Sequence, residues 1–70
     1  MMDHDVRLVF DRYMSKAKKL EEANNYVSAK EVYIDAYEIA KYFEDSAQQE
    51  AYDGVLRCRL ELTKEDDLTR

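Results

Sequence analysis

The chain has 70 residues, the length of one small domain, and a formal net charge of −5 from 16 acidic and 11 basic side chains. This acidic balance argues against a general nucleic-acid or anionic-membrane binder, because such proteins neutralise phosphates with a basic face. One cysteine excludes an intramolecular disulfide, and Cys58 and His4 do not form a zinc-type ligand set. We therefore expect no metal site and no cofactor.

Hydropathy and composition further limit the location and the fold class that we expect for this protein. No apolar run approaches the roughly 20 residues that span a bilayer, and the acidic stretch 1–10 does not fit a signal peptide. A cytoplasmic, reducing location is therefore expected. The absence of proline, the single glycine and the many Ala, Glu, Lys and Leu residues predict an all-α chain.

Three stretches show the i, i+3, i+4, i+7 spacing of apolar residues that indicates amphipathic helices. The third begins with Ser46 followed by Gln49, which has the spacing of a capping box. We predict one domain over 1–70, with helices at about 5–23, 26–43 and 46–63 and a charged, flexible tail at 64–70. The expected core stripes are Val6, Val9, Phe10, Tyr13, Ala17 and Leu20, then Ala29, Val32, Tyr33, Ala36, Ile39, Ala40 and Phe43, then Ala51, Val55, Cys58 and Leu62.

The first predicted break falls at Asn24 and Asn25, without glycine or proline. Asparagine tolerates a left-handed backbone better than any residue except glycine, so it can end a helix. Its side-chain oxygen can also cap the next helix. A link this short joins two antiparallel helices. We therefore predict a corner between two packed helices rather than one continuous helix.

The residues around this corner resemble a tetratricopeptide repeat, in which two antiparallel helices carry small and large residues at fixed spacing. The resemblance covers about 13–62 and implies three antiparallel helices, namely a right-handed hairpin plus the first helix of a second repeat. The matching positions are Tyr13, Ala17, Leu20, Asn24, Tyr26, Ala29, Tyr33 and Ala36, with Ala51 and Tyr52 opening the second repeat.

The chain departs from that repeat because it lacks its tryptophan, its corner glycine and its following proline. Solenoids usually need about three repeats to bury a continuous core. The chain is therefore either a free-standing three-helix unit or a unit that a partner completes. The run 25–36 also resembles the microtubule-interacting-and-transport domain, a three-helix bundle. That resemblance implies binding of an amphipathic peptide helix beside the third helix.

Gly54 lies inside the third predicted helix, where glycine costs about 1 kcal/mol relative to alanine. It indicates either a close crossing with another helix, which we favour, or the approach of a ligand backbone. We interpret His4 as a solvated terminal residue, Cys58 as a core residue, and acidic pairs such as Glu21 and Glu22 as solvated faces. No constellation of residues predicts catalysis, so we expect a non-enzymatic protein.

The aromatic residues indicate a binding surface. One stripe cannot bury every tyrosine of the second helix, so either some remain partly exposed or a partner covers them. The third helix offers an apolar and basic strip where a further repeat would pack. The predicted partner-binding residues are Ile34, Tyr37, Tyr42, Tyr52, Leu56, Arg59 and Leu60.

The leading hypothesis is a small cytosolic adaptor or chaperone, for example of the secretion-system type. It would bind a helical segment of another protein, or a second copy of itself, by helix-in-groove burial. The chaperone assignment follows from analogy of fold and size. The alternative is a phage- or plasmid-type regulator that inhibits a host protein by occupying its surface. Neither hypothesis involves nucleic acid or a membrane.

Overall fold

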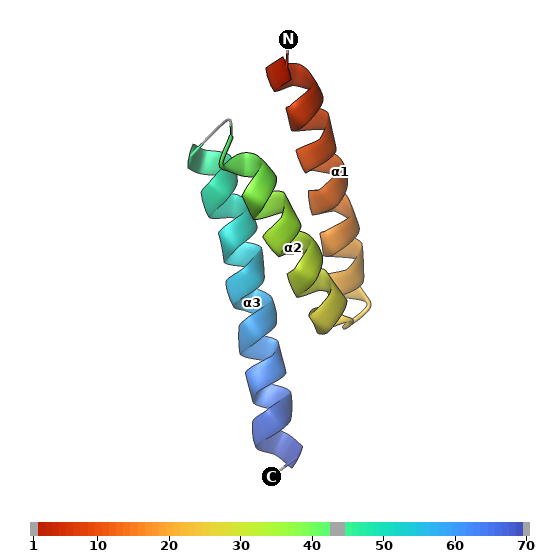
Figure 1. Cartoon of the computed structure of the whole chain (residues 1–70). Coiled ribbons are helices and arrows are strands. Elements are labelled where there is room, and N and C mark those ends of the chain that lie inside the picture. The colour runs from red at the N-terminus through yellow and green to blue at the C-terminus, as the bar shows by residue number, and fades with distance from the viewer. Residues whose placement is uncertain (1, 43–44, 70) are drawn as a thin grey trace.

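The computed structural model describes residues 2–42 and 45–69, and the side chains of 5–42 and 46–64. Over these residues the fold is all-α, as predicted. Figure 1 shows that α2 runs opposite to α1 and that α3 runs opposite to α2. The right-handedness of the hairpin stays a prediction. The helices are α1 (Met2–Glu22), α2 (Tyr26–Ala40) and α3 (Asp45–Thr69).

The middle helix, α2, holds the fold together. It packs against both α1 and α3, whereas α1 and α3 contact each other far less. The Cα atoms extend over 50 × 20 × 13 Å, so the helices form a flat, elongated layer. The N-terminal part of α1 and the C-terminal part of α3 project past α2 in opposite directions (Figure 1).

The corner between α1 and α2 is closed by backbone hydrogen bonds. Asn24 has a positive φ of 64°, which confirms the predicted left-handed helix exit. Its amide donates to the Glu21 carbonyl (3.0 Å), and the Asn25 amide donates to the Leu20 carbonyl (2.9 Å). These two bonds make a Schellman motif, in which asparagine takes the place usually held by glycine.

The next helix begins without the predicted side-chain cap. The Asn25 side chain makes no capping hydrogen bond. Its backbone carbonyl instead accepts the first bond of α2, from the Ala29 amide at 2.9 Å. The Asn24 side-chain oxygen accepts a bond from the Tyr26 hydroxyl (3.0 Å) and so is held across the corner. Both asparagines therefore shape the turn through their backbones, and Asn24 adds a side-chain bond to Tyr26.

The core contains many small residues, which lets the helix axes approach closely. Seven residues of the predicted α2 and α3 stripes are buried, whereas Val32 and Ile39 are partly buried against the core and Leu62 is half-buried. In α1 the buried side includes Met14, which is 5% exposed. Val9 and Tyr13, predicted as core, are 43% and 38% exposed. Each lies one position before a buried residue and is therefore turned about 100° away from it. The buried residues are Phe10, Met14, Ala17, Ala29, Tyr33, Ala36, Ala40, Ala47, Ala51, Val55 and Cys58.

The start of α2 at Tyr26 is as predicted, and the end of α1 and the start of α3 differ by one residue, whereas the other helix ends differ by three or more. The largest difference is in α3, which continues to Thr69, so the segment 64–69 is helical rather than a separate tail. No glycine or proline follows Gly54 to stop the helix. Lys64 and Glu61 also form an i, i+3 ion pair of 3.4 Å. The predicted core residue Phe43 and the His4 side chain lie outside the described residues.

Gly54 marks a close crossing of α2 and α3. A Cβ atom added at this position would lie 2.5 Å from Cδ1 and Cε1 of the Tyr33 ring and 2.7 Å from its Cγ. The Tyr33 side chain is fully buried, so its ring has no open space into which it can move. The close-crossing interpretation of Gly54 is therefore confirmed: a glycine lets the ring lie against the α3 backbone.

Gly54→Ala should lower the free energy of unfolding by about 1–3 kcal/mol, because the added methyl group overpacks the Tyr33 contact. This loss should appear although alanine is about 1 kcal/mol more favourable than glycine inside a helix. Urea unfolding followed by circular dichroism measures it.

Ser15→Ala is the control, because Ser15 is exposed on α1 and gains only helix propensity. It should leave stability unchanged or slightly higher. A Gly54→Ala protein that is more stable than the wild type would show that the ring yields, contrary to the packing described.

Candidate functional site

One polar cluster joins all three helices, and it consists of Glu21 from α1, Tyr33 from α2 and Arg57 from α3. The Tyr33 hydroxyl donates to Glu21 Oε1 at 2.7 Å. Arg57 Nε lies 3.0 Å from Glu21 Oε2, and a terminal guanidinium nitrogen lies 3.2 Å from Oε1. The guanidinium also lies over the Tyr33 ring, 5.7 Å from its centroid. The prediction that Glu21 is a solvated residue is therefore wrong.

The ionisation of this cluster fits a structural role. The Arg57 hydrogen bond lowers the pKa of Glu21 below 4.5 and raises the pKa of Arg57 above its ordinary value. Burial, followed by the hydrogen bond to Glu21, raises the pKa of Tyr33 to about 12. General acid–base catalysis works best with a pKa near the operating pH. The pKa values of Glu21 and Tyr33 both move away from neutral pH. This fits a stabilising Glu21–Arg57 ion pair to which an uncharged Tyr33 is hydrogen-bonded.

Stability should depend on this cluster at both ends of the pH scale. The folded pKa of Glu21 is lowered, so its contribution is present above pH 4.5 and is lost as the pH falls through the folded pKa. The folded pKa of Tyr33 is raised from 10.0 to about 12, so its contribution is present below pH 10.0 and is lost between pH 10.0 and about 12. Urea unfolding across the pH range measures both effects.

Tyr33→Phe should remove the Tyr33 part of the alkaline loss, and Glu21→Gln should reduce the acid loss. Tyr42→Phe removes the hydroxyl of an 83% exposed tyrosine and is the matched control, which should behave as the wild type. An alkaline profile that is unchanged in Tyr33→Phe would contradict the assigned hydrogen bond.

Cys58 is fully buried, and desolvation raises the pKa of its thiol. Burial therefore disfavours the thiolate, which is the nucleophilic form. The interpretation of Cys58 as a packed core residue is confirmed. Among the side chains that the structure describes, no group of three or more His, Cys, Asp or Glu is placed to hold a metal ion.

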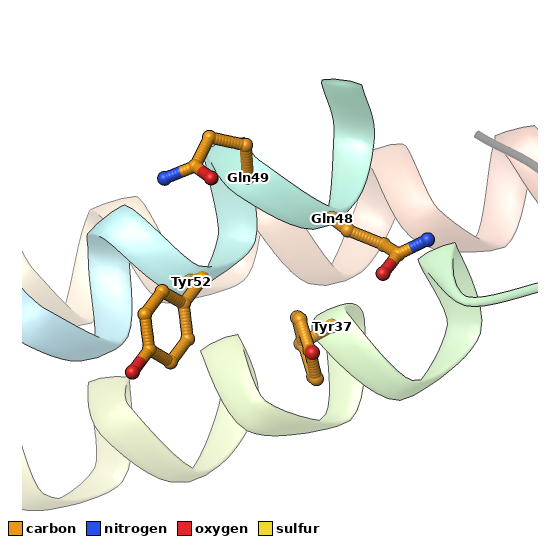
Figure 2. Close-up of a pocket in the computed structure, with 4 residues that line it drawn as sticks. All are labelled: Tyr37, Gln48, Gln49 and Tyr52. Carbon is orange, nitrogen blue, oxygen red and sulfur yellow. The ribbon is translucent and has the colours of Figure 1, made fainter. Parts of the chain in front are cut away.

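The predicted partner-binding residues other than Tyr42 lie along one side of the α2–α3 contact. The Tyr37 and Tyr52 rings lie 5.8 Å apart and are tilted by 45°. With Gln48 and Gln49 they line a hollow of about 330 Å³ between the two helices, and Figure 2 shows Gln48 reaching from α3 toward α2. We call the surface along this line the outer seam. Its residues are Lys30, Ile34 and Tyr37 of α2, Lys41 directly after α2, and Gln48, Gln49, Tyr52, Leu56, Arg59 and Leu60 of α3.

The outer seam faces away from α1. On its other flank, α2 meets α1 at a smaller hollow lined by Tyr13 and Lys16 of α1 and by Val32 and Asp35 of α2. Tyr37 instead packs with Tyr52 of α3. The two flanks of α2 are thus separate surfaces, and only one of them carries the predicted partner-binding residues.

Most of the predicted residues extend the hollow along the two helices. Ile34 lies one turn before Tyr37, and Leu56 lies one turn after Tyr52; both are partly exposed. Leu60 continues the α3 row by one more turn and is 59% exposed, and Arg59 beside it is also exposed. Tyr42 is different, because it lies in the turn after α2 and does not line the hollow.

Sequence reasoning predicted Arg59 but missed the two lysines of this surface. The Lys41 ammonium lies over the Tyr37 ring, 5.4 Å from its centroid. Lys30 is half-buried and lies one turn before Ile34, on the same side of α2. Spacing alone could have indicated both, because Lys41 follows Tyr37 by four residues and Lys30 precedes Ile34 by four.

Comparison of the chain with protein-family models, with curated proteins and with solved structures finds no significant match. The resemblances to the tetratricopeptide repeat and to the microtubule-interacting-and-transport domain therefore stay predictions. Within the described residues, no helix combines the length and apolar character needed to cross a membrane.

Proposed function

We propose that this chain is a small, non-enzymatic protein–protein interaction module that binds a helical segment of another protein along the outer seam. The observation that carries the proposal is the row of exposed apolar side chains on two adjacent helices, with the Tyr37–Tyr52 hollow between them. Two antiparallel helices with such a row form the kind of groove that receives an amphipathic helix.

The side chains of the seam suit this role physically. Exposed apolar residues that occur singly need no explanation, but a contiguous row marks an interaction surface. Ile34, Leu56 and Leu60 supply aliphatic area. Tyr37 and Tyr52 add large rings that lose little rotamer entropy on binding and keep a polar tip for water or a partner.

The remaining parts of the proposal concern class and location. An acidic, all-α chain of this size fits an adaptor or a chaperone in the cytoplasm, and secretion-system chaperones are one such group by analogy of fold and size. The non-enzymatic part rests on the sequence, in which no constellation of residues predicts catalysis. The proposed partner is a protein, with no nucleic acid and no membrane.

Replacing both Leu56 and Leu60 by aspartate should weaken partner binding by roughly tenfold or more, since each charge would be buried against an apolar stripe. Helicity should be retained, because both side chains already face solvent. Proteins captured by the wild-type chain are identified first, and the purified partner is then titrated against each variant by calorimetry.

Leu8→Asp is the matched control, because Leu8 is 49% exposed and lies on α1, away from the seam. It should bind the partner as the wild type does. Retained affinity in the Leu56→Asp/Leu60→Asp double variant, or loss of affinity in Leu8→Asp, would place binding elsewhere on the chain.

A further inference from the structure

The outer seam carries a charge of opposite sign to the whole chain. Its described charged side chains are Lys30, Lys41 and Arg59, whereas the chain has 16 acidic residues and a net charge of −5. Three exposed acidic residues, Glu31, Glu38 and Asp53, lie at its outer borders, and Asp53 accepts a hydrogen bond of 2.9 Å from Gln49. The charged side chains of the seam itself are all basic, on a protein whose net charge is acidic.

These three cations are not neutralised within the described part of the chain. The ion pairs there join Arg7 to Asp11, Arg57 to Glu21 and Lys64 to Glu61, and none involves a cation of the seam. The Lys41 ammonium lies over the Tyr37 ring, which attracts a cation but leaves its charge uncompensated. A ligand that brings carboxylates could therefore form ion pairs at this surface without breaking any that the chain already has.

The contact between Tyr37 and Tyr52 sets the position of these cations along the seam. Lys30 lies seven residues before Tyr37, and Arg59 lies seven residues after Tyr52. Because α2 and α3 are antiparallel, both residues lie toward the same end of the seam. Lys41 lies toward the other end, about 16 Å from Lys30 along α2 at 1.5 Å per residue. The apolar residues Ile34 and Leu56 lie between the two ends.

We propose that the occupant of the outer seam is an amphipathic helix with carboxylates on both sides of its apolar stripe. This inference rests on the proposed function and specifies the chemistry of the partner. The apolar stripe lies over the Tyr37–Tyr52 hollow, Ile34 and Leu56. Acidic residues pair with Lys30 and Arg59 at one end and with Lys41 about three turns away.

A second copy of the chain fits this surface less well. Two seams packed against each other would bring Lys30, Lys41 and Arg59 of one copy close to the same cations of the other. Like charges would then face each other, which opposes association.

The test uses synthetic helical peptides of about 15 residues, the length that covers α2. All peptides have one apolar stripe, flanked by glutamate in the first, lysine in the second and glutamine in the third. Labelled peptides are titrated with the full chain by fluorescence anisotropy at low and high salt. The glutamate peptide should bind roughly tenfold or more tightly than the lysine peptide, and this preference should shrink as salt rises.

Charge reversal checks the location. Lys41→Glu/Arg59→Glu should abolish or invert the preference for the glutamate peptide. Arg12→Glu/Lys16→Glu changes the net charge of the chain by the same amount on α1 and is the matched control, which should keep the preference. Equal loss of preference in both variants would show a general charge effect and overturn the inference.

The remaining outcomes separate this inference from the proposed function. Equal binding of the glutamate and lysine peptides, abolished by Leu56→Asp/Leu60→Asp, would overturn the acidic-helix inference and leave the interaction module standing. Failure of all three peptides to bind, or binding that the double variant leaves unchanged, would overturn both proposals. Sedimentation showing a dimer that the double variant disrupts, or binding to phosphatidylserine vesicles that Lys41→Glu/Arg59→Glu abolishes, would replace the acidic helix with another occupant.

Discussion

The position of the Tyr33 side chain is the constraint on which the rest of this structure depends. Its ring lies against the backbone of α3, where only a glycine leaves the necessary room. Its hydroxyl reaches α1 and donates to the carboxylate of Glu21, which the guanidinium of Arg57 also holds. Since α1 and α3 contact each other little, this residue of the middle helix links them. The contact of the Tyr33 ring with Gly54 sets the distance between α2 and α3. The hydrogen bonds among Tyr33, Glu21 and Arg57 hold the C-terminal end of α1 at one position along α3.

The outer seam follows from the same arrangement. The side of α2 that faces the core is occupied by Ala29, Tyr33 and Ala36, which are all fully buried. A flat layer of helices can cover only part of the circumference of its middle member. Larger side chains on the flank, such as Ile34 and Tyr37, are therefore left at the border between α2 and α3. Two lysines and an arginine lie around these side chains. The surface that helix packing leaves exposed therefore carries positive charge.

Local features of this fold could be predicted from sequence, whereas relations between helices could not. Asn24 was predictable as a helix exit because the left-handed preference of asparagine belongs to that residue alone. Gly54 indicated a close crossing because a glycine inside a helix needs a reason. Tyr13 and Met14 could not be separated, because neighbouring positions differ by only about 100° and both are apolar. The pairing of Glu21 with Arg57, 36 residues apart, left no pattern in the chain.

The outer seam also has features that the sequence predicted and features that depend on how the helices pack. The exposed leucines and tyrosines were predictable, because they exceed what a single helical stripe can bury. The basic character of the surface was predicted only in part. Arg59 was expected in a basic strip of the third helix, whereas the position of Lys30 beside it depends on the register of α2 and α3. The order of the helices has a further consequence, for folding kinetics. Each helix packs mainly on its neighbour in sequence, so every major contact closes a short loop. A chain of such low contact order is expected to fold on the microsecond-to-millisecond scale, with the α1–α2 and α2–α3 hairpins each able to nucleate it.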